Sequence, residues 1–203
     1  MQKLTIVCVV ILFSCLTGTV LEAIPITYQA SLDAAQTVPP GGSLATGFGA
    51  ITVDPATHLL AFEISWNNLA ANPAGLHVHC CAPVGASGML AINFQGFPGA
   101  TSGVYAQTGD LTAATLYTPQ FLTAHGGTAA QAEADLLASL AAGNVYLDIN
   151  NPLFPTGEIR GQLAAVSEPA TVMLLAVGLA SGAACQKLRA SMRRKFKQGS
   201  SFC

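Results

Sequence analysis

Apolar and polar residues alternate with a period of two in several short segments, and this pattern constrains the fold more than any other feature of the chain. Segments 26–34, 48–54 and 59–66 show it in the first half, and segments 144–150 and 157–163 show it later. Turn-forming residues separate them, as in the sequences DPATH and NPLFPT. Short alternating runs bounded by such turns are typical of antiparallel sandwiches and barrels. We therefore predict an all-β, Greek-key-like antiparallel β-sandwich.

A short helical insertion is predicted before the last two strands. Thr118 and Pro119 form a cap and first-turn pair, and Thr128 stands three residues before Gln131 in capping-box spacing. Gly143 is the expected stop, because glycine readily adopts the left-handed conformation that ends a helix. The insertion should therefore lie between residues 118 and 143.

The first 23 residues have the composition of a secretory signal peptide. Lys3 is followed by an apolar run of 13 residues, and small and polar residues then lead to Ala23. The run, expected to be helical, is short for a membrane span. We predict a signal peptide over residues 1–23; an uncleaved anchor and lipidation at Cys15 are the alternatives.

The last segment, residues 167–203, has the composition of a membrane anchor. Sixteen apolar or small residues, Ala170 to Cys185, precede a cluster that holds six of the eight basic residues of the chain. Such a run approaches the length of a membrane helix, and flanking Lys and Arg residues resist translocation. We predict a C-terminal membrane helix with its basic end in the cytoplasm and the preceding domain outside the inner membrane.

This tail resembles the PEP-CTERM sorting signal of Gram-negative bacteria, which combines a Pro-Glu-Pro motif, a span and an arginine-rich end. Here the motif is Ser167-Glu168-Pro169, with serine in place of the first proline, and the basic end includes Arg193, Arg194 and Lys195. The resemblance implies cleavage by an exosortase-like sorting protease near Glu168-Pro169. It also implies transient contact with the inner membrane and delivery to the cell envelope or extracellular matrix. A plain, lasting C-terminal anchor is the alternative.

The remaining domain, residues 24–166, is acidic. It has eight acidic residues and one basic residue, Arg160, which gives a net charge of −7. A domain of this charge is a poor candidate for nucleic-acid binding. The acidic residues are Asp33, Asp54, Glu63, Asp110, Glu133, Asp135, Asp148 and Glu158.

The sequence GLHVHCC, residues 75–81, contains the candidate metal ligands. Strand alternation puts His77, His79 and Cys81 on one face, and imidazole and thiolate groups are suitable ligands for copper or zinc. Cys81 or His125 could supply the third ligand. We favour the alternative that the two histidines are half-buried polar residues, hydrogen-bonded to loop carbonyls or to Asn150.

Three further features leave alternatives open. Cys80 and Cys81 could be free thiols, a vicinal disulfide or an intermolecular bridge. Glu158 and Arg160 share a strand face, which favours a structural ion pair over a ligand-anchoring arginine. Trp66 ends a predicted strand, which favours packing over a role as a sugar-binding platform.

Together these segments resemble the CHRD domain, a module named for chordin. The opening motifs are Val38-Pro39-Pro40 and Ala45-Thr46-Gly47, the H-x-H motif lies in GLHVHCC, and the closing motif is GEIRGQL, residues 157–163. In the strand before the closing motif, this chain has Asn150 where the family pattern has histidine. The resemblance covers residues 27–163 and implies a β-sandwich, an extracellular setting and no established catalytic activity.

We therefore predict an exported, non-enzymatic binding or structural module. Its expected partners are a sorting protease and exopolysaccharide or envelope proteins. No residue is assigned a catalytic role. The alternative is a metal-binding or redox-related domain centred on His77 and His79, with copper or zinc as its cofactor; the leading prediction requires none.

Overall fold

Strands make up most of the regular structure of the domain. The computed structural model describes residues 24–166. The strands are β1 (Ile26–Asp33), β2 (Thr46–Asp54), β3 (Leu59–Asn67), β4 (Gly75–Cys80), β5 (Met89–Phe94), β6 (Gly103–Asp110), β7 (Val145–Asn151), β8 (Phe154–Gln162) and β9 (Ala164–Ala165). The helical segments are η2 (Ala34–Gln36), η3 (Ala114–Leu116), α2 (Pro119–Ala124) and α3 (Ala129–Ala141).

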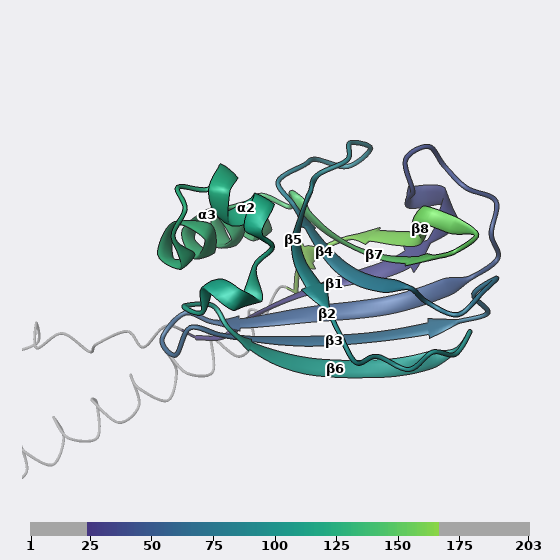
Figure 1. Ribbon diagram of the computed structural model, residues 1–203, viewed down its shortest axis with the longest axis horizontal. Helices are drawn as coiled ribbons and strands as arrows, with labels where there is room; N and C mark the ends of the chain where they lie inside the picture. The colour runs from purple at the N-terminus through teal and green to yellow at the C-terminus, as the bar shows by residue number, and fades with distance from the viewer. Residues whose placement is uncertain (1–23, 167–203) are drawn as a thin grey trace, which may run out of the picture. The chain divides into compact units, whose positions relative to one another are not determined.

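The strands form one antiparallel sheet that folds into two facing layers (Figure 1). Its order is β5-β4-β7-β8-β1-β2-β3-β6, and β9 pairs with β1. Strands β8 and β1 share one register pair, Asp33 opposite Arg160. The layers meet face to face, since Phe62 of β3 stacks on Phe94 of β5 with ring centroids 3.9 Å apart. The predicted all-β antiparallel sandwich with a small helical part is confirmed.

The core lies between the layers and is built from alternate residues of each strand. In β1, Tyr28, Ala30 and Leu32 are buried, as predicted for the inner face. Ile26, predicted for the same face, is 44% exposed at the end of the strand. Trp66 is buried and its Nε1 donates a hydrogen bond to the Ala100 carbonyl at 2.8 Å, so the packing prediction is confirmed.

The buried side chains of β7 and β8 determine which side chains of these strands point away from the core. Leu147, Ile149 and Ile159 are fully buried, and each such side chain stabilises the fold by about 1.5–3 kcal/mol. A shift of either strand by one residue would turn these side chains out of the core. The intervening residues, among them Asp148 and Arg160, are thereby held on the opposite side of the layer.

The helical insertion begins and ends where the sequence predicts. The Thr118 hydroxyl accepts a hydrogen bond from the Phe121 N–H at 3.2 Å, and the Thr128 hydroxyl accepts one from the Gln131 N–H at 3.3 Å. Gly143 has a φ of 70°, the left-handed conformation expected of a stop. The helices lie at one end of the sandwich (Figure 1).

Strands β5, β6 and the two-residue β9 were not predicted from the sequence. Strand β5 pairs with β4, and β6 pairs with β3 at the other end of the sheet order. Every residue of β6 is exposed or half-buried, so its sequence lacks a buried face. The predicted signal peptide and C-terminal membrane helix lie outside the described residues. Within residues 24–166, no helix is long and apolar enough to cross a membrane.

Candidate metal centre

A polar cluster lies on the outer side of the β4–β7–β8 layer. In β4, His77 and His79 alternate with the buried residues Leu76, Val78 and Cys80, as the period of two predicts. The register places His77 opposite Asp148 and His79 opposite Tyr146 of β7. The two histidines are thus brought together with an acidic residue about 70 positions away in the sequence.

Asp148 lies between the two imidazole rings. Its Oδ1 is 3.1 Å from His77 Nδ1, and its Oδ2 is 3.4 Å from His79 Nε2. The side chains are largely buried, with exposed fractions of 12% for His77, 16% for His79 and 8% for Asp148. One ligand atom from each residue lies within 4.8 Å of the other two. Two imidazoles and a carboxylate are a ligand set that divalent transition metals accept.

The loop after β4 fixes the orientation and tautomer of His79. The ring Nδ1 is 3.0 Å from the Gly88 carbonyl oxygen, which can only accept a hydrogen bond, so Nδ1 carries a proton. In the neutral ring Nε2 is therefore unprotonated. Nε2 is buried and has no hydrogen-bond partner, although Asp148 Oδ2 is within ion-pair range. A lone pair and a carboxylate oxygen face each other at this point.

The carboxylate and the ring shift each other's pKa values. Burial alone would raise the pKa of Asp148, but the His77 and His79 imidazoles outweigh burial and hold it below its ordinary value. Burial lowers the pKa of His79, but the Asp148 carboxylate outweighs burial and holds that pKa above its ordinary value. Asp148 is therefore an anion at neutral pH, and the space beside His79 Nε2 attracts a positive charge.

Asn150 lies beside the other histidine. A Cβ atom added to Gly75 would overlap both His77 Nε2 and Asn150 Oδ1, so both atoms adjoin the Gly75 backbone. Asn150 Oδ1 is buried and has no hydrogen-bond partner. Asn150 thus offers a free acceptor on the Nε2 side of His77.

Tyr146 and Arg160 close one side of the cluster. The Tyr146 ring stacks on His79 with an interplanar angle of 2° and centroids 4.8 Å apart. The Arg160 guanidinium lies over the same tyrosine, 3.4 Å from the ring centroid, and donates a hydrogen bond to Gln162 Oε1 at 3.1 Å. The only basic residue of the domain is therefore held by an aromatic ring and an amide.

The predicted ion pair between Glu158 and Arg160 is absent from the described residues, and that prediction was wrong. Glu158 is buried and accepts hydrogen bonds from the Ser43 hydroxyl at 2.6 Å, the Ala70 N–H at 2.9 Å and the Asn151 amide. These donors belong to three other segments and occupy both carboxylate oxygens. A shared strand face was not sufficient to pair Glu158 with Arg160, because each found nearer partners.

Cys81 is not available as the third ligand. Its sulfur is bonded to that of Cys80 in a vicinal disulfide, so no thiolate faces the histidines. This settles the alternatives for the two cysteines in favour of the adjacent bridge. His125 is also elsewhere: its Nδ1 is 2.7 Å from Asp135 Oδ2, and its ring packs on Phe121. The third group at the site is Asp148, which the sequence did not single out.

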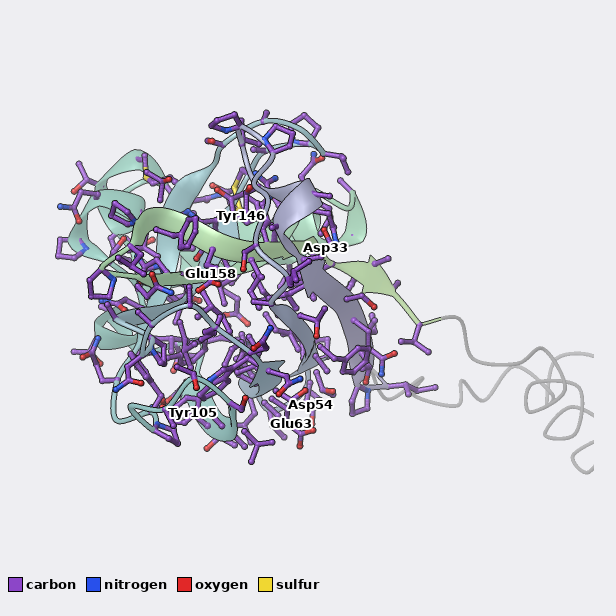
Figure 2. All side chains as sticks on the ribbon, turned by 90° about the vertical axis from the view of Figure 1, so that its right-hand side faces the viewer. Asp33, Asp54, Glu63, Tyr105, Tyr146 and Glu158 are labelled. Carbon is purple, nitrogen blue, oxygen red and sulfur yellow. A yellow bond between two sulfur atoms is a disulfide. The ribbon has the colours of Figure 1, made fainter. Side chains whose placement is uncertain are left out.

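Figure 2 shows the two layers from a second direction, with Tyr146 and Glu158 in the upper layer and Glu63 and Tyr105 in the lower. The site residues therefore belong to the layer formed by β4, β7 and β8. Arg160 of β8 is the register partner of Asp33 in β1, the next strand in the sheet order.

Comparison with known proteins supports one assignment. No curated protein matches the chain, and no solved structure matches it. The family model described as "CHRD domain" matches residues 28–163, which is more than half of the chain and includes every residue of the cluster. The chain therefore belongs to the CHRD domain family.

Proposed function

We propose that this protein is an exported, non-enzymatic CHRD-domain module that acts in the cell envelope or extracellular matrix. Membership of the CHRD domain family supports an extracellular-type module. The observation that carries export is the Cys80–Cys81 disulfide, because disulfides persist in oxidising compartments and are rare in the cytosol. The signal-peptide sequence of residues 1–23 supports the same direction of transport.

The tail provides the route to the final location. Its order of Ser167-Glu168-Pro169, an apolar run and the basic residues Arg193, Arg194 and Lys195 supports sorting by an exosortase-like protease. The membrane helix would then hold the domain at the outer side of the inner membrane until cleavage. Exopolysaccharide and envelope proteins are the proposed partners of the released domain.

Cell fractionation and protease accessibility test this proposal. The full chain is expressed in two Gram-negative hosts, one with an exosortase and one without. We expect surface or extracellular protein only in the first host and retention in the inner membrane in the second. Replacement of Arg193, Arg194 and Lys195 by Ala should cause retention in the first host, whereas Gln198→Ala serves as the control. A chain protected from protease after the outer membrane is opened would refute export.

Metal binding is the second candidate function. The specific observation in its favour is the position of Asp148 between His77 and His79, which adds a third ligand to the two that the sequence identified. This role is compatible with export, and it does not require an enzymatic activity.

A further inference from the structure

We infer that His77, His79 and Asp148 bind one divalent transition-metal ion, of which zinc is the representative, with the fourth position open. The inference deepens the second candidate function and rests on it. The ligand atoms assigned are His77 Nδ1, His79 Nε2 and a carboxylate oxygen of Asp148. The geometry, the protonation of the rings and the surroundings support this assignment independently.

The ligand atoms lie close enough together to share one ion. At zinc–ligand distances of about 2.0–2.1 Å, two ligands of a tetrahedron are about 3.3–3.4 Å apart. His77 Nδ1 is 3.1 Å from Asp148 Oδ1, His79 Nε2 is 3.4 Å from Asp148 Oδ2, and one ligand atom of each residue lies within 4.8 Å of the other two. Side-chain rotations that bring the two nitrogens and one carboxylate oxygen to about 3.4 Å from one another would complete three corners of a zinc site.

The protonation pattern at His79 matches that of a metal ligand. Histidine ligands usually donate the other ring N–H to a carbonyl or carboxylate, which fixes the tautomer. His79 does this through Nδ1 and the Gly88 carbonyl at 3.0 Å. Its Nε2 then faces Asp148 Oδ2 with no hydrogen bond, and a cation between the two atoms would satisfy both.

His77 can bind through Nδ1 by a change of tautomer. In the neutral, metal-free ring the Nδ1 proton is donated to Asp148 Oδ1 at 3.1 Å. Metal binding moves this proton to Nε2, so the ring stays neutral and no proton is lost from His77. The unpartnered Asn150 Oδ1 lies on that side of the ring and is available to accept the Nε2 proton.

The surroundings favour a transition metal over calcium or magnesium. Calcium and magnesium require mainly oxygen ligands, whereas this site offers two nitrogen atoms and one carboxylate. Arg160 of β8 lies opposite Asp148, and its positive charge opposes the binding of a metal ion. Its guanidinium is directed over the uncharged Tyr146 ring and forms no ion pair with Asp148. The His77 and His79 side chains are 12% and 16% exposed, so solvent that could supply a fourth ligand touches both residues.

Zinc titration of the full chain tests the inference. The chain is purified in mild detergent without reductant, so that the disulfide is kept, and titrated with zinc chloride calorimetrically. We expect one equivalent for the wild type, with at least about tenfold weaker binding for His77→Gln, His79→Gln and Asp148→Asn, because a lost ligand costs more than a lost second-shell contact. His125→Gln is the matched control, since His125 also pairs with an aspartate but has no second imidazole beside it.

Imidazole NMR of the wild type provides a readout that needs no variant. Zinc should shift the ring signals of His77 and His79 and leave those of His58 and His125 unchanged. Stoichiometric zinc that every variant retains would overturn this ligand set while the metal-binding role stands. The absence of stoichiometric binding by the wild type would overturn that role as well. Neither result affects the export proposal, which rests on localisation.

Discussion

The buried carboxylate of Asp148 contacts two imidazole rings. Among the described residues, no ammonium or guanidinium group forms an ion pair with it. An unpaired buried carboxylate is costly, so the histidines stabilise the anion even without a metal ion. Histidines hydrogen-bonded to loop carbonyls or to Asn150 were the favoured prediction. The contact of His79 with the Gly88 carbonyl is of that kind, whereas His77 contacts the Asp148 carboxylate instead. The same contacts leave the metal-binding alternative open to test.

Arg160 provides a prediction at the scale of one side chain. Replacing it with Ala removes the cation over Tyr146 and the hydrogen bond to Gln162. A desolvated cation–π contact contributes about 2 kcal/mol. A loss of that size should lower the melting temperature by roughly 4–8 °C for a domain of this length. Thermal unfolding followed by circular dichroism measures the change.

Arg160→Lys is the matched control for this prediction. It keeps the positive charge but loses the planar group that stacks on the ring, so we expect an intermediate melting temperature. An unchanged melting curve for Arg160→Ala would show that the tyrosine contact contributes little to the fold, and would favour the ligand-anchoring role for the arginine.

At the scale of strands and helices, the sequence predicted the elements whose cues are local. Alternation located β1, β2, β3, β7 and β8, and capping residues located both α-helices. Strands β5 and β6 were missed because β6 has no buried residue and β5 is a short strand between irregular segments. Local cues specify an element, but they do not specify its neighbour.

The third site residue was missed for the same reason. Asp148 stands two residues from both Tyr146 and Asn150, so alternation could have placed all three on one face of β7. The pairing of β7 with β4 depends on the long-range register, in which His77 is opposite Asp148. The missing histidine at Asn150 also drew attention to the wrong position on the strand.

The contact between the β2–β3 turn and α3 provides a prediction at this scale. His58 Nδ1 is 2.8 Å from Glu133 Oε1, and this contact holds the pKa of His58 above its ordinary value. Its stabilising effect is complete below the unfolded-state pKa of about 6.5 and is lost as pH rises through the folded-state pKa. The melting temperature of the wild type should therefore exceed that of His58→Asn by more at about pH 6 than at about pH 9.

His58→Asn is chosen because asparagine suits the backbone conformation at this position. His58 has a φ of 56°, and Asn tolerates this left-handed conformation better than most residues. Glu133→Gln, which removes the partner's charge, should reduce the same pH dependence. A difference in melting temperature that stays constant across this pH range would show that the contact does not involve a titrating histidine.

At the scale of the whole molecule, we propose different roles for three parts of the sequence. The CHRD domain supplies the folded module, and its disulfide is consistent with the proposed export. The proposed signal peptide and sorting tail supply the transport. The sandwich and its family could be predicted from the sequence because the pattern and motifs extend over nearly the whole domain. The partner could not be predicted, because binding specificity depends on surface geometry that alternation does not encode.

The intact mass of the protein recovered from the cell surface or medium tests the central claim of export and processing most directly. We predict a chain that begins after Ala23 and ends near Glu168-Pro169, with a mass about two daltons below that of the reduced form because Cys80 and Cys81 are joined. A chain found only inside the cell, with both terminal segments present and free thiols at Cys80 and Cys81, would contradict the account.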